Sequence, residues 1–152
     1  MYSMNRWFNS RQTFQISRIS TRKIIYKPDT VFLQIGGNDI NPTSTPMEVF
    51  NKIKSFACDL LSVYGVSKVI VGSVFRRFHP RGMCYEDFEK KRKSVNDLLC
   101  DHFKDSMVFW KLRGLVDPEK SAFRKDGVHL NDSSEINYVK QIKLALFCKS
   151  FK

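Results

Sequence analysis

Three short segments rich in β-branched and aromatic residues alternate along the chain with longer segments of helical periodicity. The strand-like segments lie at 30–35, 68–75 and 107–110, and the helical ones at 45–64, 85–103 and 133–147. Connections of this length are crossovers, which join parallel strands and place helices on both faces of a sheet. The alternation therefore predicts an α/β fold, a three-layer α/β/α sandwich around a parallel sheet.

The first two helices carry more specific signals. Thr45 and Glu48 have the spacing of a capping box at the start of the first helix, with Pro46 in its first turn. The second helix has a predicted inner face made of Phe88, Val95, Leu98 and Leu99. The basic run at 90–93 is predicted to lie on the solvent-exposed face of that helix.

A polar loop that contains two glycines follows the first predicted strand, at Gly36, Gly37, Asn38 and Asp39. Glycines let the backbone turn sharply and expose its N–H groups, and Asn38 adds a side-chain donor. Such a loop could form an oxyanion hole, in which donors stabilise the negative charge that develops in a transition state. An ordinary turn at the end of a strand is the alternative, because the same residue types are common in turns.

A second polar loop, just before the last helix, contains Asp126, Gly127 and His129. A carboxylate three residues before an imidazole can fold back and accept its N–H, which leaves the other ring nitrogen free to act as a base. This spacing is also common in simple turns and helix caps. Both polar loops are nevertheless expected at the same edge of the sheet, where parallel α/β proteins bind ligands.

A strand that ends in Gly36 and Asn38, followed much later by Asp126 and His129, resembles the SGNH hydrolases, also called GDSL-type esterases and lipases. Both segments are especially similar to animal SGNH-like domains, including those associated with retroelement proteins. The resemblance implies a flavodoxin-like three-layer sandwich and serine ester hydrolysis through an acyl-enzyme. It implies that His129 is the catalytic base and that Asp126 orients it. It also implies an oxyanion hole with Asn38 as a donor and Gly36 beside it.

The chain departs from the family pattern at its start. The resemblance covers about residues 24–148, and the first glycine of the sequence is Gly36, so the Gly-Asp-Ser block of the family is absent. We therefore assign no nucleophile and expect the first strand of the family sheet to be missing. Residues 24–152 are expected to form a partial SGNH hydrolase-like domain, inactive as this chain. A small ester would be its substrate only if the missing N-terminal part were supplied.

We predict no metal site and no cofactor. His79 and His102 lack further ligands at metal-binding spacing, and the four cysteines form no Cys-x-x-Cys pair. This use of cysteine favours a reduced, intracellular chain. No apolar run approaches the length of a membrane-spanning helix, which needs about 20 residues.

Basic charge is concentrated ahead of the predicted domain. The net charge is +11, and residues 1–28 hold six basic side chains and no acidic one. We expect residues 1–23 to be a variable basic leader, whose composition is also typical of a mitochondrial transit peptide. The competing function is a non-catalytic, retroelement-derived module that binds protein or, weakly through this leader, nucleic acid. The basic loop at 76–81 is predicted to be solvated, with contact to nucleic acid or to a substrate as the alternatives.

Overall fold

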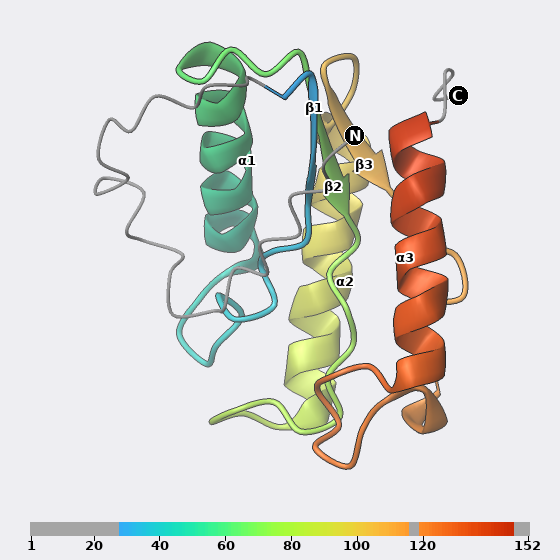
Figure 1. Ribbon diagram of the computed structural model, residues 1–152. Coiled ribbons are helices and arrows are strands. Elements are labelled where there is room, and N and C mark those ends of the chain that lie inside the picture. Colours follow the sequence, from blue (N-terminus) through green and yellow to red (C-terminus); the bar gives the residue numbers. More distant parts are fainter. Residues whose placement is uncertain (1–27, 116–118, 148–152) are drawn as a thin grey trace, which may run out of the picture.

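A parallel sheet forms the centre of the computed structural model, which describes residues 28–115 and 119–147. Its strands are β1 (Thr30–Leu33), β2 (Lys68–Gly72) and β3 (Met107–Trp110), which lie side by side in that order (Figure 1). Both pairings are parallel, with Val31 opposite Val69 and Ile70 opposite Val108. The predicted α/β class with a parallel sheet is confirmed.

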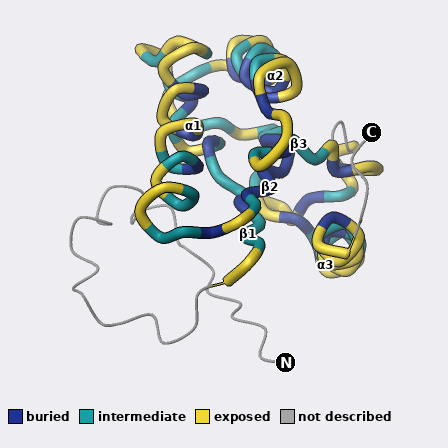
Figure 2. Tube along the Cα trace, turned by 90° about the horizontal axis from the view of Figure 1, so that it is seen from above, coloured by how far each residue is buried: buried dark blue, intermediate teal, exposed yellow. Residues whose placement is uncertain are grey.

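Helices cover both faces of this sheet. The helices α1 (Pro46–Ser62) and α2 (Tyr85–His102) lie on one face, and α3 (Asp132–Phe147) lies on the other (Figure 2). A short 3-10 helix, η2 (Lys120–Ala122), lies in the connection before α3. This arrangement is compatible with the predicted three-layer α/β/α sandwich.

The β1 edge of the sheet is open within the ranges 28–115 and 119–147, because β1 pairs there with β2 alone. The helix α3 packs next to β1 and leaves several apolar side chains exposed, namely Ile136, Val139, Leu144 and Phe147. The absence of a family strand beside β1 stays a prediction. The predicted leader at 1–23 lies outside the described residues.

The start of α1 has the predicted capping box. The Thr45 hydroxyl accepts a hydrogen bond from the Glu48 N–H at 3.2 Å, and the Glu48 carboxylate accepts one from the Thr45 N–H at 2.7 Å. Pro46 occupies the first helical position, where its missing N–H costs nothing. These local bonds fix where the loop after β1 ends.

Two apolar clusters flank the sheet. The larger packs against α1 and α2 and includes Val49, Ile53, Ala57, Phe88, Val95 and Leu99. The smaller includes Tyr138 of α3 together with Leu112, Leu115, Phe123 and Leu130. The central strand β2 lies between them, and Val69, Ile70 and Val71 are fully buried. Such two-sided burial is typical of parallel sheets.

The prediction that the basic run at 90–93 faces solvent is wrong for Arg92, whose side chain is 1% exposed. Its Nε donates to Glu89 Oε1 at 2.8 Å, and its Nη1 donates to the carbonyl of Val74 at 3.2 Å. Four consecutive residues span more than one turn of a helix, so one of them must face the sheet. Arg92 occupies that position because Glu89, one turn earlier, supplies a carboxylate.

We expect Glu89→Ala to destabilise the fold by about 3 to 5 kcal/mol, because it leaves the buried Arg92 without its carboxylate. Equilibrium unfolding in urea measures this change. Asp97→Ala removes an exposed carboxylate from the same helix and should cost less than about 0.5 kcal/mol. Equal losses in the two variants would contradict a structural role for the Glu89–Arg92 pair.

Candidate functional site

The polar loops singled out in the sequence lie at one edge of the sheet. The three strands are parallel and end at the lower edge in Figure 1, where loop 34–45 follows β1 and loop 73–84 follows β2. Loop 123–131, before α3, reaches the same edge, because the Phe78 N–H donates to the carbonyl of Gly127 at 2.8 Å. This is the carboxyl edge, at which open α/β sheets bind ligands.

Asp126 and His129 form a hydrogen-bonded pair in loop 123–131. The His129 Nδ1 donates to Asp126 Oδ2 at 2.6 Å, and the other carboxylate oxygen accepts the N–H groups of Val128 and His129, each at 2.9 Å. A carboxylate can only accept here, so the ring proton is on Nδ1. The Nε2 atom of a side chain that is 72% exposed is then free to act as a base.

These hydrogen bonds lower the pKa of Asp126 well below its usual range. The bond from the His129 side chain is the largest cause, and the two backbone N–H groups add to it. Asp126 is therefore a carboxylate at any physiological pH, and it orients the imidazole of His129. The contact that the sequence spacing predicted is present, while the catalytic roles stay predictions.

Asn38 is exposed in the loop after β1, and its orientation is set by Arg77. The Arg77 Nη2 donates to Asn38 Oδ1 at 2.5 Å. A guanidinium has donors only, so the carboxamide must turn its oxygen toward Arg77 and its Nδ2 away. Within the part of the chain that the structure describes, Asn38 Nδ2 makes no hydrogen bond. An exposed amide donor of this kind is what an oxyanion hole requires.

Neither glycine of this loop leaves room for a larger side chain. Gly36 is buried at φ +97°, and a Cβ there would come within 2.8 Å of the Ile53 side chain. Its carbonyl accepts the Asp39 N–H at 3.0 Å, which closes a turn. At Gly37, a Cβ would lie 3.0 Å from Arg77 Nη2. Gly36 thus shapes the turn that presents Asn38, and its own place in an oxyanion hole stays a prediction.

Residues 77–79 join the two polar loops. Arg77 reaches Asn38, and two residues later the His79 Nδ1 donates to the backbone carbonyl of Asp126 at 2.9 Å. Two residues of extended chain span at most about 7 Å, so the residues that contact Asn38 and Asp126 lie close together in the chain and in space. The structure therefore brings Asn38 and the Asp126–His129 pair to a common edge rather than to opposite ends of the molecule.

Sequence reasoning missed the importance of loop 76–81, which it predicted to be solvated. Phe78 stacks on Tyr85 with ring centroids 5.5 Å apart and meets Phe123 edge-on at 5.4 Å. These contacts hold the loop against the body of the protein, and Arg77 and Phe78 are only partly exposed. An aromatic residue inside a basic loop was the one available signal, because it indicates a packed loop.

The described residues supply no nucleophile to His129. None of the hydrogen bonds of His129 there involves a serine, threonine or cysteine. The buried Ser73, at the end of β2, instead accepts a hydrogen bond from the Leu112 N–H at 3.3 Å. Across 28–115 and 119–147, no three acidic, histidine or cysteine side chains gather as metal ligands would, and none of the helices could span a membrane.

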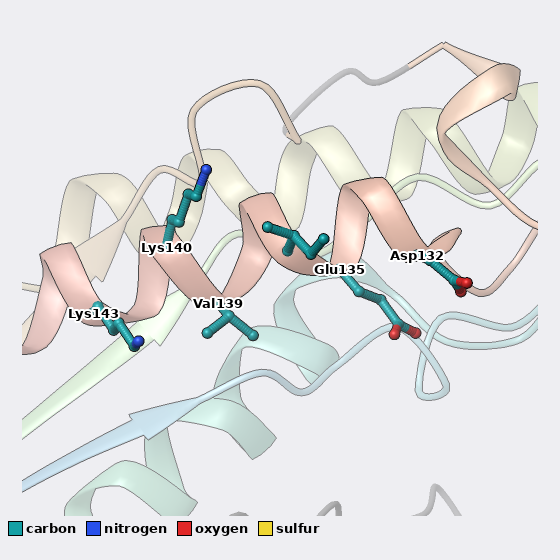
Figure 3. A pocket seen from close by; sticks show the side chains of 6 residues that line it. Asp132, Glu135, Val139, Lys140 and Lys143 are labelled. Atoms are coloured by element: carbon teal, nitrogen blue, oxygen red, sulfur yellow. The ribbon is translucent and has the colours of Figure 1, made fainter.

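A hollow beside α3 lies outside this group of loops (Figure 3). It is open to solvent and is lined by side chains of α3 alone, namely Asp132, Glu135, Ile136, Val139, Lys140 and Lys143. In Figure 3, Val139 and Lys143 point toward the side of β1, and Lys140 points away. None of the predicted site residues lines this hollow, so the candidate site remains at the carboxyl edge.

Comparison of the sequence with models of known protein families and with curated proteins finds no match. The assignment of a function therefore depends on the residues and contacts described above.

We expect the carboxyl group of Asp126 to titrate well below the ordinary aspartate value of about 3.9. His129→Ala should raise the Asp126 midpoint, because the imidazole hydrogen bond is the largest cause of the shift. Carbon-detected NMR of the side-chain carboxyl groups over pH measures both values. Because the pKa is lower in the folded state, the contact stabilises the fold above about pH 3.9, and this contribution is lost as pH falls through the folded-state pKa.

His102→Ala is the matched control for this titration. His102 lies at the end of α2, where its Nδ1 donates to the carbonyl of Leu98 at 2.9 Å. Its loss should leave the Asp126 midpoint unchanged. An Asp126 midpoint that does not move in His129→Ala would mean that the hydrogen bond between the two side chains does not form in solution.

Proposed function

We propose that this chain is an SGNH hydrolase-type esterase domain that keeps the base, its orienting carboxylate and one oxyanion donor, and that is inactive as this chain. The observation that carries the proposal is the joint position of two elements at one sheet edge. The Asp126–His129 pair leaves Nε2 free, and Asn38, oriented by Arg77, presents its Nδ2 at the same edge of the sheet. A hydrogen-bonded Asp–His pair and an exposed Asn are each common in proteins. Their presence together at the carboxyl edge of one parallel sheet is what acyl transfer requires.

In a site completed by a serine, these residues would share the work of ester hydrolysis. The serine oxygen would bond to the ester carbonyl carbon while His129 Nε2 takes the hydroxyl proton. Asp126 would stabilise the imidazolium that forms, and Asn38 Nδ2 would donate to the carbonyl oxygen as it gains negative charge. His129 would then return the proton to the departing alcohol, which leaves an acyl-serine for water to hydrolyse.

The inactivity follows from the missing nucleophile. The sequence holds no Gly-Asp-Ser segment, and His129 has no serine, threonine or cysteine partner among the residues described. Removing the nucleophile from a catalytic triad lowers the rate by about 10⁶-fold, because the base and its orienting carboxylate act only through the nucleophile.

The competing function, binding of nucleic acid or protein through basic charge, has less support in the described residues. Several basic side chains there are already held by acidic or carbonyl groups of the same chain, namely Lys52, Arg76, Lys91, Arg92 and Arg124. Cations held in this way are less available to phosphates.

We expect this chain to hydrolyse p-nitrophenyl acetate no faster than its His129→Ala variant, because no nucleophile is present for His129 to activate. Release of p-nitrophenolate, followed by absorbance, measures the rate. Robust turnover that disappears in His129→Ala would show that the chain supplies its own nucleophile, and the predicted inactivity would then be wrong.

The positive test uses the coding sequence upstream of Met1. If it contains an in-frame Gly-Asp-Ser segment, the extended protein should hydrolyse p-nitrophenyl acetate, and His129→Ala or Asn38→Ala should reduce that rate by about 100-fold or more. An extended protein with this segment and no esterase activity would contradict the proposed function. A stop codon at this place would favour the binding module.

A further inference from the structure

The guanidinium of Arg77 is held in place at the carboxyl edge by uncharged groups. Its Cζ lies 5.9 Å from the ring centroid of Phe88, in a cation–π contact. On another side it packs against Gly37, where a Cβ would come within 3.0 Å of Nη2 and 3.4 Å of Cζ. The position of this cation is therefore built into the fold and does not depend on an ion pair.

Arg77 differs from the other arginines that contact side chains in the structure. Arg76 and Arg92 form salt bridges with Glu89, and Arg124 forms one with Glu135. The hydrogen bond of Arg77 goes to the neutral Oδ1 of Asn38, and no carboxylate lies within 4.0 Å of it among residues 28–115 and 119–147. Since a guanidinium has five N–H donors, most of them have no acceptor there.

Positive charge is in excess around this guanidinium. Burial is the largest cause of a lowered pKa at Arg77, and the charge of Arg81 lowers it further. The nearest acidic influence is Asp39, whose own pKa is raised by burial and whose carboxylate also faces Lys52 at 3.9 Å. The carboxylate of Asp39 is thus shared between Arg77 and Lys52, and a further anion would be favourable here.

We propose that Arg77 forms a binding site for the oxyanion of a small ligand, a carboxylate or a phosphate group. A guanidinium matches the planar geometry of both groups and binds them through two parallel hydrogen bonds. The site lies between Asn38 and the Asp126–His129 pair, on the segment that joins them. It goes beyond the proposed ester hydrolysis, and if that function holds, the anion belongs to the ester substrate.

The test is a titration of the ¹⁵N-labelled full chain with methyl hydrogen succinate, an ester with one free carboxylate, and with its neutral counterpart dimethyl succinate. The Arg77 Nε–Hε signal and the Asn38 side-chain amide signal are followed by NMR. We expect saturable binding of the acid at millimolar concentration and about tenfold weaker binding of the diester. Competition by inorganic phosphate would show that the site accepts phosphate as well as carboxylate, and no competition would restrict it to carboxylate.

Two variants with the same charge change complete the experiment. Arg77→Met should weaken binding of the acid by about tenfold or more. Arg113→Met removes an exposed arginine that follows β3, and it should leave the affinity close to that of the wild type. Arg77→Lys should keep part of the affinity, because it keeps the charge but not the paired donors.

Three results would each overturn the oxyanion site. These are equal affinity for acid and diester, no loss in Arg77→Met, and an equal loss in Arg113→Met. The two proposals fail separately. An Asn38 shift with both esters but no preference for the acid would overturn the oxyanion site alone. Anion binding at Arg77, together with an inactive extended protein that has the Gly-Asp-Ser segment, would overturn the esterase alone.

Discussion

Two hydrogen bonds between the Asn96 side chain and the Val74 backbone fix the point at which the central strand becomes a loop. The Val74 N–H donates to Asn96 Oδ1 at 2.8 Å, and the Val74 carbonyl accepts from Asn96 Nδ2 at 3.2 Å. The buried Arg92 donates to the same carbonyl. Because buried backbone groups must be paired, these bonds fix the direction in which the chain leaves β2. The chain continues from there to Arg77 and His79, which contact the two polar loops.

The two halves of the candidate site differ in how strongly their geometry supports a function. The contact between Asp126 and His129 spans three residues, and Asp126 also accepts two backbone N–H groups, so a local turn alone would produce much of it. The contact between Arg77 and Asn38 joins residues 39 apart in sequence. Only the fold can bring these two together. This contact, together with the bond from His79 to the carbonyl of Asp126, is therefore what turns two common loops into one candidate site.

The sequence allowed prediction of those features that depend on neighbouring residues. The capping box at Thr45 and the alternation of strands and helices are of this kind. The strand β2 ends at Gly72 rather than at 75, because the Gln34 side chain donates to the carbonyl of Ser73 and ends the ladder with β1. This bond has no local signal, since it depends on what the sheet places opposite Gln34, whereas the burial of Arg92 had a local signal in Glu89, one helical turn earlier. The described residues do not test the predictions that a family strand is missing beside β1 and that residues 1–23 form a basic leader.

Arg77 links the two proposals through a single charge. Its donors fix the orientation of the Asn38 amide, and its positive charge favours the negative charge that would develop beside Asn38 during acyl transfer. A ligand anion bound to Arg77 would keep the first effect and weaken the second, because it neutralises the guanidinium. The positive charge of Arg81, which also acts on Arg77, limits that loss. An anionic ester would therefore bind more tightly, but its transition state would be stabilised less by Arg77. The charge of Arg77 would thus contribute more to substrate selection than to the rate of the reaction.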